Sequence, residues 1–196
     1  EVNTSLQKQL SENELLRAKL QEQAIRDPLT GAFNRRYFSE ALDQEAARSS
    51  RENSPFSILI LDVDHFKQFN DTYGHKCGDI VLQALANFLN ENTRHGDIVC
   101  RYGGEEFVIL MTDVASEAAY KRAELFRKQF EEMAVEYDGK SLQCTFSAGI
   151  ASYPAHAVSG ETLLTNADHA LYQSKSNGRN RVSIYSPQTH YQTAVK

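Results

Sequence analysis

The spacing of apolar residues along the chain predicts several amphipathic helices. Apolar side chains recur at helical intervals over residues 35–50, 115–133 and 161–176. Asp79 is a residue type that caps helices, and Ile80, Leu82, Leu85, Phe88 and Leu89 follow it at helical spacing. We therefore expect a fourth helix that begins at Asp79.

Short apolar or alternating segments predict the strands of a sheet. Residues 57–63 (SILILDV) form an apolar run that is typical of a buried central strand ending in carboxylates. A Gly-Gly pair at positions 103 and 104 separates two β-type segments, which predicts a hairpin over residues 98–111. Further strands are expected over residues 142–150 and 181–185. Because a hairpin interrupts the alternation of strands and helices, the pattern favours an α/β (α+β) domain with a mixed central sheet and surrounding helices.

The first 26 residues have a different pattern. Residues 4–26 contain neither Gly nor Pro, and an imperfect heptad runs through Leu6, Leu10, Asn13, Arg17, Leu20 and Ala24. This pattern is compatible with a coiled coil that pairs two chains or with a solvated helical linker. Asp27-Pro28 should end the helix. We therefore expect a long N-terminal helix over residues 1–26 and a domain over residues 27–196.

Composition narrows the functional classes. The chain has 21 Lys and Arg against 26 Asp and Glu, a net charge of −5, and no basic block, which argues against binding to a nucleic acid polymer or an anionic membrane. No apolar stretch is long enough to span a bilayer, and no signal peptide is recognisable. The three cysteines form no CxxC pair and the histidines show no zinc spacing, so we expect buried thiols in a cytoplasmic domain. Whether the full-length protein is linked to a membrane stays open.

Two acidic pairs are the first candidate chemistry. Asp62 and Asp64 are two residues apart at a strand end, where side chains share one side, and like charges there call for a cation. Glu105 and Glu106 follow the Gly-Gly turn of the hairpin. Carboxylates without Cys or His suit a hard ion such as Mg²⁺, which commonly takes few protein ligands and several phosphate oxygens. Each pair alone could also be a solvated loop end.

Candidate phosphate-binding residues accompany the carboxylates. Lys67 follows the acidic strand end, and the segment 74–79 (GHKCGD) places glycines before a helix, where backbone N–H groups can face an anion. Lys175 and Arg179 add positive charge late in the chain. Carboxylates and cations together indicate phosphoryl or nucleotidyl transfer.

These segments resemble, in order, the motifs of the GGDEF domain, the family of diguanylate cyclases. Residues 101–107 (RYGGEEF) look like its signature in the GGEEF variant, and residues 27–31 (DPLTG) with 34–36 (NRR) look like its opening motif. Its metal and guanine segment resembles residues 62–67 (DVDHFK), 70–71, 74–75 and 78–79. Its closing motif resembles residues 167–172 (ADHALY), 175 and 178–181 (GRNR).

The resemblance implies a palm-like fold that condenses two GTP into cyclic di-GMP, with two subunits face to face. It implies that Asp62, the Val63 carbonyl and Glu105 bind Mg²⁺, with Mn²⁺ as an alternative, and that Glu106 is a metal ligand or the catalytic base. It further implies that Asn70 and Asp79 recognise guanine. Lys67, Lys175 and Arg179 would bind phosphates, and Lys67 would also stabilise charge during transfer. Additional substrate contacts would come from Phe66, His75 and Arg101.

Regulation is the last implication. Arg94 and Asp97 match an RxxD motif that binds the product and inhibits many family members, although an exposed turn would also explain these residues. An upstream sensory domain is the expected partner in the full-length protein. A silent receptor for GTP or cyclic di-GMP is the alternative function, but the acidic and basic residues that the reaction needs are all present.

Overall fold

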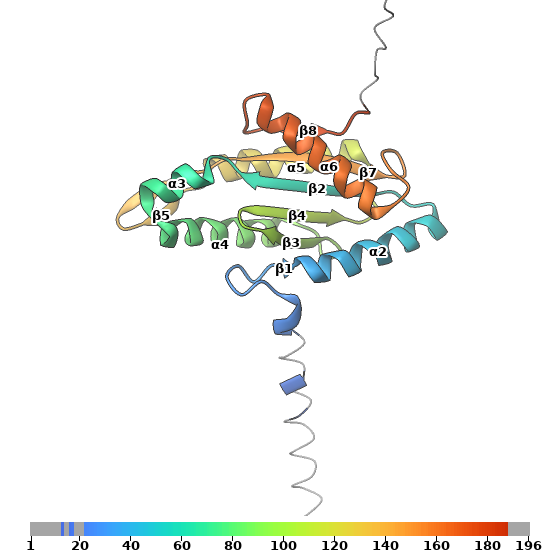
Figure 1. Cartoon of the computed structure of the whole chain (residues 1–196), viewed down its shortest axis with the longest axis horizontal. Helices are drawn as coiled ribbons and strands as arrows, with labels where there is room; N and C mark the ends of the chain where they lie inside the picture. The colour runs from blue at the N-terminus through green and yellow to red at the C-terminus, as the bar shows by residue number, and fades with distance from the viewer. Residues whose placement is uncertain (1–12, 14–15, 18–21, 188–196) are drawn as a thin grey trace, which may run out of the picture.

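A six-stranded mixed sheet forms the centre of the molecule. The computed structural model describes residues 13, 16, 17 and 22–187. The strand order is β1-β3-β4-β2-β7-β8 (Figure 1). Strand β2 pairs antiparallel with β4 and with β7, whereas β1 runs parallel to β3 and β8 runs parallel to β7. The strands are β1 (Phe33–Asn34), β2 (Phe56–Val63), β3 (Ile98–Gly103), β4 (Glu106–Met111), β7 (Phe146–Tyr153) and β8 (Val182–Ile184).

Helices cover both faces of this sheet (Figure 1). Helices α4 (His75–Asn92) and α5 (Ser116–Glu132) pack on Leu59, Leu61 and Val63 of β2. Helices α2 (Arg35–Glu52) and α6 (Gly160–Ser176) pack on the opposite face, against Ile58 and Ile60. Side chains alternate between the two faces of a strand, so Asp62 belongs to the face that α2 and α6 cover.

A glycine allows helix α6 to lie directly on the sheet. A Cβ atom built at Gly149 in β7 would lie 2.1 Å from the backbone nitrogen of Leu171 and 2.2 Å from the carbonyl oxygen of Ala167. Real Cβ atoms do not approach backbone so closely, because the overlap is strongly repulsive. The absence of a side chain at Gly149 therefore fixes how near α6 comes to the end of β2.

Most of the predicted elements are confirmed with shifted ends. The hairpin of β3 and β4 is present, with an irregularity between Arg101 and Gly103, and the mixed sheet has helices on both faces. The three cysteines are buried free thiols, as expected, and burial raises the pKa of Cys100 to about 12 and of Cys144 to about 11.

Two predicted boundaries are wrong. Asp79 does not cap a helix: α4 begins at His75, and an additional helix α3 (Phe66–Tyr73) precedes it, with Gly74 at φ 85° between the two. The strand expected over residues 142–150 is divided. The two halves pair with different partners: β6 (Lys140–Leu142) forms a small hairpin with β5 (Val135–Tyr137), whereas β7 starts at Phe146 and pairs with β2 and β8. The Thr145 carbonyl accepts the backbone N–H of Asp64 at 2.9 Å, which extends the contact between β7 and β2 by one residue.

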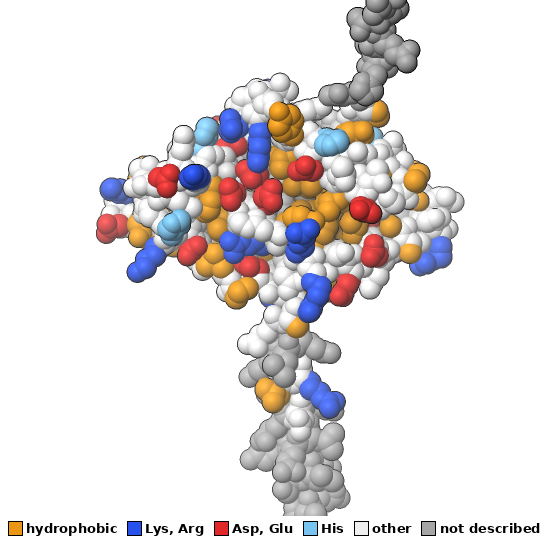
Figure 2. All heavy atoms as spheres, viewed as in Figure 1, with side chains coloured by type: hydrophobic (Ala, Val, Ile, Leu, Met, Phe, Trp, Pro, Cys, Tyr) orange, Lys and Arg blue, Asp and Glu red, His pale blue; other side chains and the backbone are white. Residues whose placement is uncertain are grey.

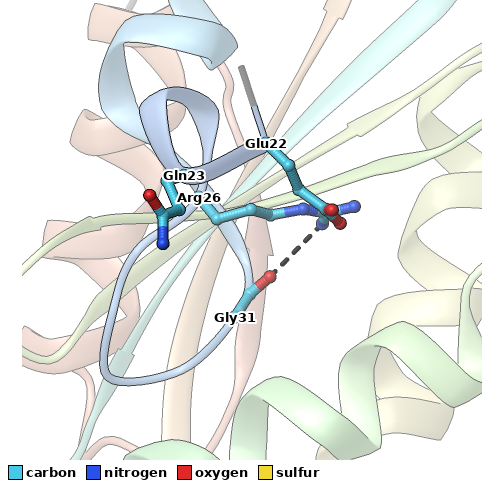
Figure 3. A pocket seen from close by; sticks show the side chains of 4 residues that line it. All are labelled: Glu22, Gln23, Arg26 and Gly31. Carbon is cyan, nitrogen blue, oxygen red and sulfur yellow. Dashed lines mark hydrogen bonds between the residues drawn. The ribbon is translucent and has the colours of Figure 1, made fainter. Parts of the chain in front are cut away.

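The N-terminal helix meets the domain at a short turn. Residues 13, 16, 17 and 22–25 are helical, and the helix ends before Asp27-Pro28, as predicted. Leu6, Leu10 and Leu20 of the proposed heptad lie outside the described residues. A hollow of about 540 Å³ lined by Glu22, Gln23, Arg26 and Gly31 marks the junction, where Arg26 donates to the carbonyl of Gly31 at 3.3 Å (Figure 3). Within the described residues, no helix combines the length and the apolar character needed to cross a membrane.

Candidate functional site

Two acidic side chains face each other on neighbouring strands. Asp62 in β2 and Glu106 in β4 are direct partners in the antiparallel register, so their side chains project to the same face. Glu105 immediately precedes this pair, and its carbonyl accepts the backbone N–H of Val63 at 3.4 Å. The pairing of β2 with β4 thus brings Asp62, at the end of β2, next to Glu105 and Glu106, which follow the hairpin turn.

Helix α6 brings a cation to this acidic pair. Lys175 lies in its last turn, and the Nζ atom is 2.9 Å from Oδ2 of Asp62. The close contact of α6 with Gly149 of β7 holds this turn near the end of β2. Figure 2 shows acidic side chains gathered near the middle of the viewed face, with Lys and Arg side chains on both sides of them.

The environment shifts the pKa values of both acids upward. Burial is the main cause for Asp62, with further contributions from Glu105 and Asp64, and Lys175 opposes the shift. Burial and the neighbouring charge of Asp62 raise the pKa of Glu106, Lys175 again opposes, and Asp168 adds to the rise. Lys175 compensates the negative charge of these acids only in part, which favours binding of a further cation.

The donor set suits a hard divalent ion that also takes phosphate oxygens. Among the described residues, no three His, Cys, Asp or Glu side chains form a ready-made metal cage. Mg²⁺ typically uses one or two protein carboxylates and completes its shell with water and substrate phosphates. Asp62, Glu105 and Glu106 therefore fit Mg²⁺ bound together with a nucleotide better than a structural metal.

Helices α3 and α4 bring together the residues expected to recognise guanine. A Cβ atom at Gly78 would lie 1.9 Å from Oδ1 of Asn70 and 3.1 Å from Cζ of Phe66, so this glycine makes room for the Asn70 amide. Oδ1 of Asn70 is buried and has no hydrogen-bond partner in the part of the chain that the structure describes. Asp79 is exposed one residue further along α4, and His75 begins that helix.

The expected phosphate-binding residues are accessible. Lys67 lies in the first turn of α3 and is exposed. Arg179 is exposed in the loop after α6, with a backbone φ of 63°. Both side chains are therefore accessible to an anion.

Arg101 has protein partners that its expected substrate role did not anticipate. Its Nη1 atom lies 3.0 Å from Oδ1 of Asp27, and its Nε donates to the carbonyl of Gly104 at 2.9 Å. The same Asp27 oxygen accepts the backbone N–H and the hydroxyl of Thr30. Arg101 thus joins the turn after the N-terminal helix to the turn that carries Glu105.

The RxxD residues form a turn next to another arginine. Oδ2 of Asp97 accepts the backbone N–H of Arg94 at 3.0 Å and also bonds to Nη2 of Arg122 in α5. The Asp97 side chain is only 1% exposed, whereas Arg94 is exposed. Nη1 of Arg122 is buried and finds no acceptor among the residues that are described.

Sequence reasoning missed three contributions. The sequence pattern predicts a cation between Asp62 and Asp64, but the Asp64 carboxylate accepts hydrogen bonds from Thr145, Ser147 and Asn180. Asp168 lies seven residues, or two turns, before Lys175 on α6, and this spacing could have placed it near the site. Nothing in the sequence pattern pointed to Arg122, because its contact with Asp97 joins two separate elements.

Comparisons with known proteins identify the family. Residues 24–181 match the family described as "Diguanylate cyclase, GGDEF domain". The chain is 40% identical over 170 residues to diguanylate cyclase A of Treponema denticola, which covers 85% of this chain and 46% of the relative. It is 41% identical over 163 residues to the response regulator PleD of Caulobacter vibrioides, covering 82% and 36%. The chain thus spans less than half the length of these relatives.

Solved structures give the same result. The coiled coil and GGDEF domain of DgcB from Caulobacter crescentus, in complex with c-di-GMP, superposes with a TM-score of 0.84 at 30% identity, covering 93% of this chain and 98% of that chain. The active GGEEF domain of a diguanylate cyclase from Vibrio cholerae superposes with a TM-score of 0.73 at 33% identity, covering 78% and 97%. With this fold, this acidic pair and the family match over residues 24–181, the chain belongs to the GGDEF domain family.

Proposed function

We propose that this chain is a diguanylate cyclase that joins two GTP into cyclic di-GMP and releases two pyrophosphates. The observation that carries the proposal is the register pair of Asp62 and Glu106, with Lys175 2.9 Å from Asp62. Asp62 is buried and Glu106 half-buried, and close acidic side chains of this kind suit a site that binds a metal ion for catalysis. The relatives named diguanylate cyclases support the same choice.

The reaction needs an activated hydroxyl and neutralised phosphates. In each of two steps, a ribose 3′ oxygen of one GTP forms a bond to the α-phosphorus of the other, the bond to the β-phosphate breaks, and pyrophosphate leaves. Mg²⁺ held by Asp62, the Val63 carbonyl and Glu105 would supply Lewis acidity for these steps. Glu106, with its raised pKa, is suited to accept the hydroxyl proton or to complete the metal site.

Base recognition is assigned to Asn70 and Asp79. The exposed Asp79 carboxylate can accept from N1 and N2 of guanine, which are donors that adenine does not offer at these positions. Leaving such acceptors unsatisfied penalises the wrong base, so ATP should be a poor substrate. Phe66 and His75 lie on the same pair of helices and would contact the nucleotide.

The reaction requires two copies of the chain. Each subunit would hold one GTP, and a two-fold dimer would bring the two nucleotides face to face. The helix over residues 1–26 is the proposed dimerisation segment, and the domain over residues 27–196 the proposed catalytic unit. We also place a sensory domain upstream in the full-length protein.

Product inhibition is proposed at Arg94 and Asp97. Arg94 is exposed and would contact a cyclic di-GMP phosphate, and the buried Asp97 would hold the turn and Arg122 in place. Arg94→Ala should leave the initial rate unchanged and weaken inhibition by added cyclic di-GMP about tenfold, as expected when one charged contact is lost. Inhibition curves of the two proteins that coincide would remove this site.

The decisive experiment is incubation of the chain with GTP and Mg²⁺ followed by chromatography of the nucleotides. We expect cyclic di-GMP from the wild type, none after chelation of the metal, and none from Asp62→Asn. Binding of cyclic di-GMP or GTP without any turnover at high protein concentration would instead support the silent receptor.

A further inference from the structure

We propose that Asn180 and Asp64 are positioning residues, which together with Arg127 and Glu131 fix the loop that presents Arg179 to the triphosphate. The inference rests on the proposed function, since it assigns a role in substrate binding. It concerns residues that touch neither the nucleotide nor the metal in that proposal. Its basis is a set of contacts that hold a backbone in an unfavourable conformation.

The loop after α6 has three successive residues with positive φ. The angles are 109° at Gly178, 63° at Arg179 and 45° at Asn180. Glycine adopts this region easily, but a side-chain-bearing residue such as Arg179 is disfavoured there. The backbone N–H of Arg179 still bonds to the Ser174 carbonyl at 3.0 Å, as at many helix ends. An unsupported loop of this shape would relax to other conformations, so its contacts decide whether it persists.

Asp64 ties the loop backbone to the end of β2. Its Oδ2 atom accepts the N–H of Asn180 at 3.0 Å and the hydroxyl of Thr145 at 2.7 Å, and its Oδ1 accepts the hydroxyl of Ser147 at 2.6 Å. Asp64 is only 8% exposed. A buried carboxylate with three donors has its hydrogen-bonding capacity met within the protein. Asp64 therefore anchors the loop after α6 to the chain segment that follows Asp62.

The Asn180 side chain ties the same loop to α5. Its Oδ1 accepts from Nη1 of Arg127 at 2.8 Å, and its Nδ2 donates to Oε1 of Glu131 at 2.8 Å. Arg127 also bonds to Glu131 at 2.8 Å and is held by Glu124, and its side chain is only 11% exposed. Every polar group of the Asn180 amide that faces α5 therefore has a fixed partner.

Together these contacts set the position of Arg179 relative to the acidic pair. Lys175 lies four residues before Arg179 and contacts Asp62, while Asp64 holds Asn180, the residue after it. Arg179 itself is exposed. A loop ordered before the ligand arrives spares the nucleotide the entropy of ordering it, which improves binding of the phosphates.

The test compares Arg127→Ala and Asn180→Gly with Arg48→Ala. Glycine at 180 keeps the positive φ and removes only the side chain. Arg48 forms a comparable network with Glu45, Glu52 and Asp113, remote from the loop, and serves as the matched control. We expect the first two variants to raise the KM for GTP about ten- to hundredfold, and to weaken binding of inorganic pyrophosphate similarly, without changing the affinity for guanosine. Arg48→Ala should change none of these.

A double-variant cycle identifies the route of the effect. If Arg127 acts through Arg179, then Arg127→Ala should add little to the KM increase caused by Arg179→Ala. Additive effects, or a KM in Arg127→Ala and Asn180→Gly no higher than in Arg48→Ala, would overturn the inference.

Hydrogen exchange gives a readout that does not depend on activity. The Asn180 amide of the wild type should exchange slowly because Asp64 accepts its proton, and it should exchange faster in Arg127→Ala. Fast exchange in the wild type would refute the positioning role even if every variant misfolded. A wild type that exchanges slowly here but makes no cyclic di-GMP would instead refute the proposed function.

Discussion

Two identical residues at the end of β2 have different roles. Asp62 lies beside Lys175 and opposite Glu106, whereas Asp64 is fully hydrogen-bonded by Thr145, Ser147 and Asn180. The sequence predicted the acidic strand end and the side that both residues share. It could not distinguish them, because the donors to Asp64 lie 81 to 116 residues further along the chain. Local pattern gives candidates for a site, and distant partners decide their roles.

The raised pKa of Glu106 implies that its charge weakens the fold. Glu106→Gln should lower cyclic di-GMP formation at least about 100-fold, since the proton acceptor or metal ligand is lost. It should also raise Tm by about 1–3 °C in the absence of metal, because the substitution removes a charge that burial and repulsion from Asp62 both disfavour. Scanning calorimetry and an activity assay check both effects, with Glu40→Gln on the exposed face of α2 as the control. A lower Tm in Glu106→Gln would contradict the view that the charge of Glu106 weakens the fold.

At the scale of elements, the helix pair α3 and α4 differs most from the prediction. The sequence pattern located the apolar face that follows Asp79 but missed the first turn of α4 and the whole of α3. Residues 66–77 carry few apolar positions, and the break between the helices depends on Gly74, whose φ is 85°. A glycine in a polar segment is equally typical of a loop, so periodicity could not reveal two helices there.

The contact between these helices can be tested at Gly78. Gly78→Ala should displace Asn70, since the added Cβ would lie 1.9 Å from its Oδ1, and should raise the KM for GTP about tenfold. Gly160→Ala is the matched control, because its Cβ would lie 2.9 Å from Cγ of Leu42, away from α3 and α4. Both variants should lose about 1–3 kcal/mol of stability. An equal change of KM in both would show that the effect is not local.

The turn after the N-terminal helix depends on pH through Asp27. Burial opposes the charged form of Asp27, but hydrogen bonds from Thr30 and Arg101 outweigh it and lower the pKa of this carboxyl. The stability gained is therefore present above the ordinary value of 3.8 and is lost as the pH falls through the lowered pKa.

Asp27→Asn should lower Tm by about 2–4 °C at pH 7, corresponding to a loss of about 1 kcal/mol after solvent screening. The difference from the wild type should shrink as the pH falls below 3.8, because wild-type Asp27 then becomes neutral. Asp43→Asn, at an exposed position of α2, should show no such trend. Thermal unfolding at a series of pH values measures this, and a constant difference between wild type and Asp27→Asn would contradict it.

At the scale of the whole molecule, the layered architecture was predictable. The hydrophobic pattern gave the mixed sheet, its central strand and the helices on its faces, because each of these buries a long apolar face. The edge strand β1 and the small hairpin of β5 and β6 were missed, since strands of two or three residues carry no measurable alternation. The strand order, too, depends on long-range pairing that no local pattern encodes.

The two-copy mechanism predicts how activity depends on protein concentration. Specific activity should rise with concentration in the range where dimers are scarce, because in the proposed mechanism each subunit would hold only one of the two GTP molecules. Leu10→Pro should lower activity in this range and have less effect at high concentration. Rate measurements from nanomolar to micromolar protein, with sedimentation of the same samples, check this. Constant specific activity, or a chain beginning at Ala24 that is equally active and equally dimeric, would exclude the helix as the pairing element.

The site is sensitive to substitution at Gly149, although this residue has no functional group of its own. A single methyl group there would act as a wedge between β7 and the backbone of α6 at Ala167 and Leu171. The lysine at the far end of that helix would swing away from Asp62, although every chemical group of the reaction would still be present. The contact between Lys175 and Asp62 therefore depends on the absence of a side chain at Gly149.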